Sequence, residues 1–188
     1  MPLMGALCIA SYPSPLGPLT LASEGERLVG LWFEGQRHYG ARWPLASARV
    51  GWAPPLRAAF AWLESYFAGA RPSPSALPLA PVGTPFRLAV WRLLLRLPYG
   101  SVTTYGALAQ SLRSSGLAAS PRAVGGAVGH NPISIIIPCH RVVAAARAAS
   151  LQYAAGAQRK LALLRHEQGA PLPSPHLPSH QSPIIHNA

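Results

Sequence analysis

The sequence predicts an α+β chain in two parts: a small N-terminal domain of sheet and helix, followed by a mostly helical domain that contains a helix-turn-helix. Extended apolar runs come first, at 16–22 and 27–33, whereas helix-start signals and helical spacing dominate after residue 84. The Pro/Ser-rich segment 70–75 is typical of a linker. We therefore place one domain at 1–76 and a second at 77–168. The stretch 169–188, rich in Pro, Ser and His, is predicted to be a disordered tail without a metal site.

In the first domain, the two apolar runs flank Ser23-Glu24-Gly25-Glu26, a pattern that predicts a β-hairpin turn. A helix is predicted over 55–69 because Phe60, Leu63 and Phe67 recur at helical spacing and Gly69 is suited to a C-terminal cap.

In the second domain, three helices are expected to begin at N-capping residues. Thr84 precedes Pro85 at the first start, the pair Thr103-Thr104 marks the second, and Ser120 precedes Pro121 at the third. Pro98-Tyr99-Gly100 ends the first helix, and Asn131-Pro132 follows the third. Two short helices joined by a turn favour a helix-turn-helix, although simple helix packing would give the same pattern.

The charge distribution is uneven. The net charge is +11, and from residue 85 onward nine arginines and Lys160 face a single carboxylate, Glu167. Such an excess favours a nucleic-acid partner, with a solvated basic surface as the alternative. The two cysteines exclude a disulfide framework and a four-thiolate zinc site. We expect no metal and no cofactor. No run suits a membrane span or a signal peptide, which predicts a cytoplasmic protein.

Arg122 occupies an unusual position. It lies in the first turn of the third helix, where the helix dipole disfavours a cation, so DNA contact explains it better than stability does. The small residues that follow leave a slim helix face for either DNA or another helix. These are Ala123, Gly125, Gly126 and Ala127.

Cys139 is the candidate nucleophile. The run 135–137 predicts a short buried strand that Pro138 interrupts, which would display Cys139 at a strand end. Flanking His140 and Arg141 offer proton acceptance and positive potential, the factors that stabilise a thiolate. The alternative, a small buried hydrophobe, is our interpretation of Cys8.

A triad is predicted from the roles of three residues. Neighbouring side chains on an extended segment point to opposite faces, so His140 is expected to act on Cys139 through water or a bend. Glu167 would orient His140 from a last helix at 156–167, with Leu161 and Leu164 packed inward.

Several motifs, taken in order, resemble those of the O6-alkylguanine-DNA alkyltransferases. The resemblance is specific over about 83–167 and looser near the start, at 14–20 and 31–33. The motifs are Gly83-Thr84-Pro85-Phe86, Val90-Trp91, Tyr105 with Leu108-Ala109, Arg122-Ala123-Val124-Gly125, Asn131-Pro132 and Pro138-Cys139-His140-Arg141-Val142.

The resemblance implies a ribonuclease H-like first domain and a single-turnover methylated-DNA-[protein]-cysteine S-methyltransferase. Its expected reaction is the irreversible, stoichiometric transfer of an alkyl group from O6-alkylguanine in DNA to Cys139, with O4-alkylthymine as a second candidate substrate. The expected partner is duplex DNA, bound through the minor groove by a monomer, and the expected place is the bacterial nucleoid.

The resemblance also implies roles for individual residues. Arg122 would fill the gap in the base stack, Tyr105 would help the base rotate and protonate the leaving guanine, and Asn131 would brace the turn carrying Cys139. The DNA-facing set would further include Ala123, Gly126 and Ala127. The substrate pocket would be formed by Val128, Val142, Tyr153, Ala154 and Ala155.

The chain departs from the family at the pocket loop, where alanines at 144–149 and Tyr153-Ala154-Ala155 stand in place of a glycine-rich pattern. Alanine adopts positive φ angles poorly and adds a methyl group, so altered base selectivity is expected. Three alternatives remain: a non-catalytic lesion-binding relative, a helix-turn-helix regulator, and a hydrolytic cysteine enzyme.

Overall fold

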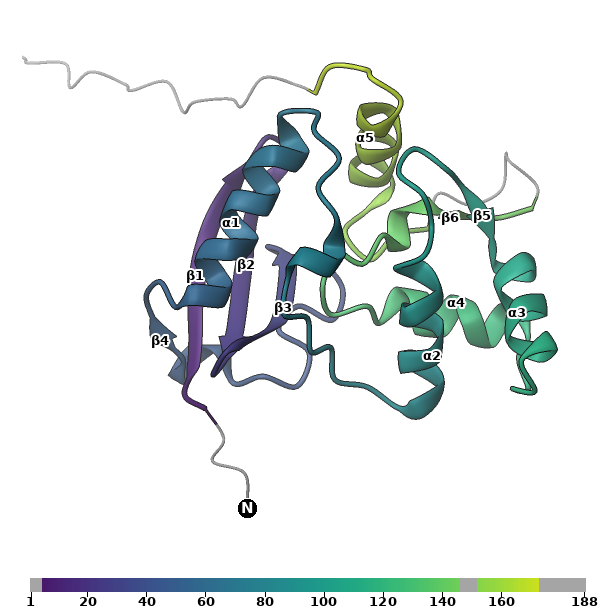
Figure 1. The fold of residues 1–188 in the computed structure, drawn as a ribbon, viewed down its shortest axis with the longest axis horizontal. Helices are drawn as coiled ribbons and strands as arrows, with labels where there is room; N and C mark the ends of the chain where they lie inside the picture. The colour runs from purple at the N-terminus through teal and green to yellow at the C-terminus, as the bar shows by residue number, and fades with distance from the viewer. Residues whose placement is uncertain (1–4, 146–151, 173–188) are drawn as a thin grey trace, which may run out of the picture.

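A computed structural model describes residues 5–145 and 152–172. Its larger sheet contains β1 (Leu7–Ser14), β2 (Gly17–Glu24), β3 (Arg27–Phe33) and β4 (Arg49–Val50) in the order β3-β2-β1-β4, with β4 parallel to β1 and the other pairs antiparallel. Helix α1 (Pro54–Phe67) crosses one face of this sheet (Figure 1). The helical half of the chain lies next to the edge of the sheet that β3 forms.

The predicted hairpin is confirmed as β2 and β3. Glu24 pairs with Arg27, so the turn is only Gly25-Glu26, with Gly25 at φ 54°. The sequence did not reveal β1, which pairs with β2 along its whole length. Its buried residues alternate with more exposed ones, and the apolar residues 7–10 are followed by Pro13 and two serines, so this mixed run did not predict a strand.

The predicted helices of the second half are confirmed as α2 (Pro85–Leu94), α3 (Tyr105–Ser114), α4 (Pro121–Gly129) and α5 (Ala157–Glu167). The side chains of Thr84, Thr104 and Ser120 each accept a hydrogen bond from the backbone N–H three residues on. Helices α3 and α4 pack together as the helix-turn-helix. A short parallel ladder joins β5 (Thr103–Thr104) to β6 (Val142–Val143). Three single-turn helices complete the elements: η1 (Leu45–Ser47), η2 (Pro74–Ala76) and η3 (Cys139–Arg141).

The strand predicted at 135–137 is wrong. Ile135 has φ 69°, a left-handed conformation that no strand residue adopts, and the Ile137 N–H bonds back to the Ile133 carbonyl. This segment is a buried turn. Only Ile133 bridges to the sheet, beside Leu31 of β3, and residues 78–80 hydrogen-bond to the same strand at Leu28. The free edge of β3 is thereby covered.

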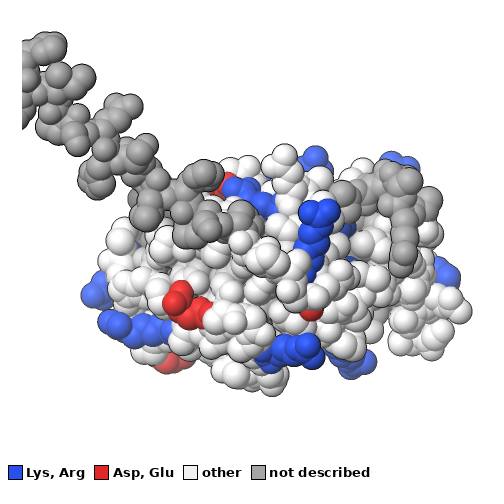
Figure 2. Space-filling view, turned by 90° about the horizontal axis from the view of Figure 1, so that it is seen from above, with Lys and Arg blue, Asp and Glu red and all other residues white. Residues whose placement is uncertain are grey.

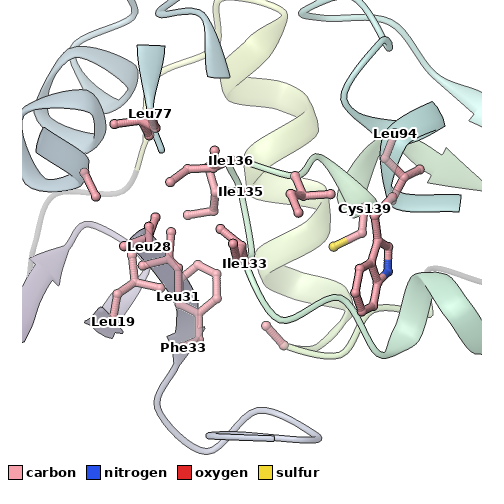
Figure 3. Close-up of a cluster of buried hydrophobic side chains, with 14 of the residues drawn as sticks. Leu19, Leu28, Leu31, Phe33, Leu77, Leu94, Ile133, Ile135, Ile136 and Cys139 are labelled. Carbon is pink, nitrogen blue, oxygen red and sulfur yellow. The ribbon is translucent and has the colours of Figure 1, made fainter. Parts of the chain in front are cut away.

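The hydrophobic core is continuous between the two halves. In Figure 3, Leu28 and Leu31 of the sheet face Ile133 and Ile136, and Cys139 lies just beyond them toward the helices. The Trp91 indole of α2 donates to the Ala127 carbonyl of α4 at 2.9 Å, which satisfies its polar atom inside this core. The buried turn is therefore the element that joins sheet and helices.

In the described residues, no helix is long and apolar enough to cross a membrane. The predicted disordered tail lies outside the described residues from residue 173 on, as does most of the alanine-rich loop, at 146–151.

Gly30 of β3 tests the packing of the sheet. A Cβ at this position would overlap the Trp32 indole, which is fully buried two residues along the same strand face. Gly30→Ala should lower the free energy of unfolding by about 1–3 kcal/mol, measured by urea denaturation. Gly51→Ala is the matched control, because nothing lies within 4 Å of its added methyl group. Equal stability of the two variants would contradict this packing.

Candidate active site around Cys139

Cys139 begins the single turn η3 and is 3% exposed. Asn131, just beyond the end of α4, holds it there. The Asn131 Nδ2 amide donates to the Ile133 and Ile137 carbonyls at 3.2 and 2.8 Å and lies 3.0 Å from Cys139 Sγ, while its Oδ1 accepts from the Ile133 N–H. One side chain therefore closes the buried turn and points a donor at the sulfur.

The electrostatics of Cys139 are dominated by its burial. Burial raises the pKa of the Cys139 thiol, although the Asn131 hydrogen bond and the Lys160 ammonium both act to lower it. The thiol is thus protonated at rest at neutral pH, and deprotonation requires a base. Burial therefore outweighs the groups that favour the thiolate in the free protein.

Lys160 is the cation that acts on the sulfur, and the sequence gave no signal for it beyond its position on the last helix. It is fully buried on α5, and its Nζ donates to the Val142 and Gln152 carbonyls at 2.5 and 3.0 Å. Burial lowers the pKa of Lys160, partly offset by Cys139. The same group therefore ties β6 to the start of the last helix and places a positive charge near the thiol.

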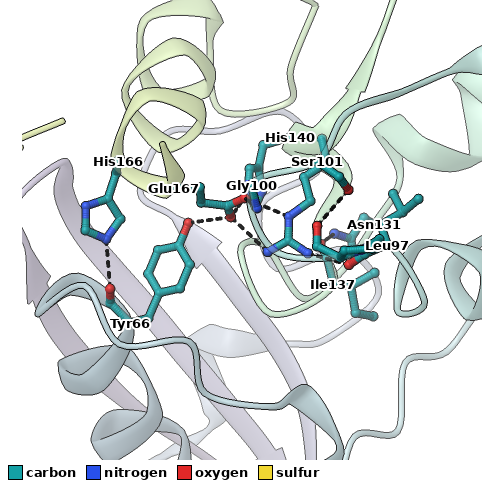
Figure 4. Close-up of polar contacts among 11 residues, drawn as sticks. Tyr66, Leu97, Gly100, Ser101, Asn131, Ile137, His140, His166 and Glu167 are labelled. Atoms are coloured by element: carbon teal, nitrogen blue, oxygen red, sulfur yellow. Dashed lines mark hydrogen bonds and ion pairs between the residues drawn. The ribbon is translucent and has the colours of Figure 1, made fainter. Parts of the chain in front are cut away.

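Glu167 collects hydrogen bonds from both halves of the chain (Figure 4). Its Oε1 accepts from His140 Nε2 at 2.6 Å and from the Tyr66 hydroxyl at 2.9 Å, and its Oε2 accepts from the Gly100 N–H at 3.0 Å. The Arg141 guanidinium donates to both oxygens, at 2.8 and 2.9 Å. Burial alone raises the pKa of the Glu167 carboxyl, but the hydrogen bonds from His140 and Arg141 outweigh it and hold the pKa well below its usual range.

These contacts fix the tautomer of His140. Because the Glu167 carboxylate accepts from Nε2, the neutral imidazole carries its lone pair on Nδ1. Burial lowers the pKa of His140, so the ring is neutral at neutral pH. Within the described part of the chain, Nδ1 is buried without a hydrogen-bond partner. The ring is therefore an oriented base with a free lone pair.

Two sequence predictions about this network need correction. Arg141 does not supply potential to the thiol, because its guanidinium is committed to Glu167 and to the Leu97 carbonyl at 2.7 Å. On α5, Leu161 and Leu164 are only partly buried. The inward face is instead Lys160, Leu163 and Glu167, spaced three and four residues apart.

Tyr66 is a site residue that the sequence did not single out. It lies on α1 in the first half of the chain, is 1% exposed, and reaches Glu167 across 101 positions of sequence. The His166 Nε2 also bonds the Tyr66 carbonyl at 2.8 Å. The sequence signal was its spacing after Leu63, which places it on the inner face of the helix but does not identify a partner.

A cavity of about 520 Å³ lies next to the site, although Cys139 itself does not line it. Tyr105 and Tyr153 line it, and both interact electrostatically with the Cys139 sulfur, which raises the pKa of each hydroxyl in addition to the larger effect of burial. The Tyr153 hydroxyl is buried and lacks a hydrogen bond of good geometry in the described residues. The cavity therefore ends at two protonated tyrosines next to the thiol.

The structure places the predicted site residues in two groups. The cavity is lined by Tyr105, Arg122, Gly126, Val128, Tyr153 and Ala154. Beneath it, Cys139, Asn131, His140 and Glu167 form the buried chain of contacts described above. The remaining four do not line the cavity. Val142 and Ala155 are buried, Ala127 is buried against Trp91, and Ala123 is exposed in the first turn of α4.

Basic side chains stand singly among uncharged ones on the face shown in Figure 2, with few acidic ones beside them. On this face the positive charge predicted from the composition is spread rather than gathered into one patch.

Comparison with known proteins agrees with this architecture. Two family models match: the ribonuclease-like domain of 6-O-methylguanine DNA methyltransferase over residues 7–81, and its DNA binding domain over 85–169. The methylated-DNA--protein-cysteine methyltransferase of Mycobacterium leprae is 40% identical over 161 residues, which cover 84% of this chain and 90% of the relative. The chain belongs to the 6-O-methylguanine DNA methyltransferase family. Another family member, from Haemophilus influenzae, is 39% identical and covers 88% of each chain.

Solved structures of the methyltransferase family share the fold. The Mycobacterium tuberculosis OGT in complex with DNA has a TM-score of 0.73 at 37% identity, covering 87% of this chain and 95% of that one. The O6-methylguanine-DNA methyltransferase of Pyrococcus kodakaraensis has a TM-score of 0.61 at 28% identity, covering 86% and 98%. The predicted α+β class and family are confirmed.

Glu167 should control the acid stability of this methyltransferase-family chain. Its pKa is depressed in the folded state, so its contribution to stability is complete above its unfolded value of about 4.3 and is lost as the pH falls below that value. Glu167→Gln should cost about 3 kcal/mol at neutral pH and flatten the acid loss, measured by urea denaturation at a series of pH values. The exposed Glu26→Gln is the control. If the free energy of unfolding of Glu167→Gln fell with acid as steeply as that of the wild-type protein, this role would be ruled out.

Proposed function

We propose that this chain repairs DNA by direct reversal, transferring the alkyl group of O6-alkylguanine irreversibly to Cys139 in a single turnover. The observation that carries the proposal is a buried thiol with an oriented neutral His140 and an anionic Glu167, beside a cavity that Arg122 and helix α4 line. Tyr105 and Tyr153 connect the two, since both line the cavity and interact with the sulfur. The membership of the family supports it.

The proton of the thiol leaves toward His140 Nδ1. No direct hydrogen bond joins Sγ to the imidazole in the described residues, so a water molecule would relay the proton, which is one of the two routes that the sequence left open. The imidazolium that forms is stabilised by the Glu167 carboxylate at 2.6 Å. The thiolate is stabilised in turn by the Asn131 amide and the Lys160 ammonium.

The sulfur then attacks the alkyl carbon in line with the carbon–oxygen bond. A C–S bond forms as the C–O bond breaks, and its electron pair passes to the guanine. Burial and the nearby Cys139 raise the pKa of Tyr105, which keeps its hydroxyl protonated and able to donate to the leaving base. The thioether does not revert, which makes the reaction stoichiometric.

We further propose that α4 enters the minor groove. Arg122, exposed at its first turn, would fill the space left by the extruded base, and Ala123 and Gly126 would follow the groove, while Ala127 packs inward against Trp91. Val128, Tyr153 and Ala154 would contact the flipped guanine, with Val142 and Ala155 buried behind them. The same proposal includes the domain boundaries at 76 and 168. It also includes a monomeric state and a location on the bacterial nucleoid in the cytoplasm. The known proteins that the chain resembles give no support to a regulator or a non-catalytic relative.

Incubation with duplex DNA containing O6-methylguanine should add one methyl group to Cys139. Intact-mass and peptide spectra should show a single mass shift at this residue. Cys8→Ser is the matched control and should be methylated normally, whereas Cys139→Ser should not. Absence of an adduct on folded wild-type protein would overturn the proposed function.

Arg122→Ala should slow repair of duplex DNA by about tenfold or more while reaction with free O6-benzylguanine changes little, because only the duplex leaves a gap to fill. The measurement is the second-order rate constant for each substrate. An equal loss on both would show that Arg122 acts inside the pocket and not in the base stack.

A further inference from the structure

Two histidines stack across the rim of the cavity, and neither belongs to the site described above. The ring of His38, in the loop after β3, lies 3.9 Å from the ring of His130, with 24° between their planes. The Arg37 N–H anchors this loop by donating to the Ala154 carbonyl at 2.9 Å. A residue of the first half of the chain is thereby fixed at the mouth of the cavity.

The stack lies at the opposite end of α4 from Arg122. The exposed face of this helix, from Pro121 through Gly125 and Gly129, lines the cavity, and His130 is its C-terminal cap. His130 follows Arg122 by eight positions, a distance of about 12 Å along the helix axis. The helix face proposed to enter DNA is therefore bounded by a cation at one end and an imidazole pair at the other.

The groups that act electrostatically on His38 are all basic ones. They are the His130 imidazole after α4, Arg37 of its own loop and Arg87 of α2. Burial, followed by these three groups, lowers the pKa of His38, so its ring is neutral in the free protein at neutral pH. None of the described residues that line the cavity is acidic. The site lacks a counter-charge that an anionic ligand would provide.

The geometry of His130 fixes where a proton can be added. Its Nδ1 lies 2.7 Å from the Gly126 carbonyl, which only accepts, so Nδ1 carries the hydrogen. Nε2 therefore holds the lone pair. This nitrogen lies at the C-terminal end of α4, where the helix dipole favours positive charge.

We propose that the His38–His130 stack is a phosphate-binding element: it takes up one proton from solvent as duplex DNA binds, and holds a backbone phosphate at the end of α4 remote from Arg122. Two protonated rings at this distance would repel each other, so the pair shares a single proton. A phosphate favours the charged form, so the bound complex holds the proton more tightly than the free protein does. This inference rests on the proposed DNA binding, but not on the alkyl transfer.

The linkage fixes the sign of the pH effect. DNA affinity should increase as the pH falls and should be lost as it rises through the proton affinity of the bound pair, by about tenfold for each pKa unit that the phosphate adds. The probe is a short unmodified duplex at constant salt, measured between about pH 6 and about pH 8. Calorimetry in buffers of different ionisation enthalpy should show uptake of close to one proton by the wild-type protein.

The variants His38→Gln and His130→Gln keep a flat polar side chain that does not titrate in this range. Each should flatten the pH dependence and abolish most of the proton uptake. Arg49→Gln is the matched control: it removes one positive charge from exposed β4, on the far side of the sheet from α4 (Figure 1), and should weaken binding without changing its pH dependence.

Binding by the wild-type protein without proton uptake, or uptake that persists in both histidine variants, would overturn the inference. Reaction of the wild-type protein with free O6-benzylguanine separates this failure from that of the proposed function, since the free base carries no phosphate. Methylation of Cys139 together with pH-independent DNA binding would leave the alkyl transfer standing and remove only the histidine element.

Discussion

The Glu167 carboxylate is where the two halves of the chain meet. It is the only acidic residue after Glu64, and it accepts hydrogen bonds from α1, from the turn at Gly100 and from η3. Filling its lone pairs with donors keeps it ionised in the interior, where an unpaired charge would be prohibitively costly. Its negative charge in turn orients His140. It also binds the Arg141 guanidinium, which therefore does not act on the thiol. The position of the proposed base, the docking of α1 and the C-terminal end of α5 all depend on this one anion.

A second constraint acts on the sulfur. Asn131 satisfies the carbonyls of a turn that has no ladder to satisfy them, and the same amide reaches Sγ. Burial holds the thiol protonated, while Asn131 and Lys160 lower the cost of the thiolate once a base removes the proton. Because a protonated thiol is a weak nucleophile, the proposed reaction depends on the base that removes its proton.

The parts of the fold that follow from local rules could be predicted from the sequence, and the parts that depend on distant partners could not. Thr84, Thr104 and Ser120 cap helices through bonds to residues three positions away, so short sequence windows reveal them. The run at Ile135 has the composition of a strand, yet Asn131 and the edge of β3 fold it into a turn. Cys139, His140 and Glu167 were recognised from residue type and motif order. Tyr66 and Lys160 were not, because their roles arise only when residues of separate elements meet.

Lys160 has one further consequence. It is the sole lysine among sixteen basic Lys and Arg residues, and its ammonium is fully buried and bonded to two carbonyls. Reagents that attack side-chain amines, such as succinimidyl esters and reductive alkylation mixtures, therefore find no accessible lysine on the folded protein. Labelling at lysine would therefore require the protein to open. The rate at which Lys160 is acylated would measure how often the core around the thiol opens.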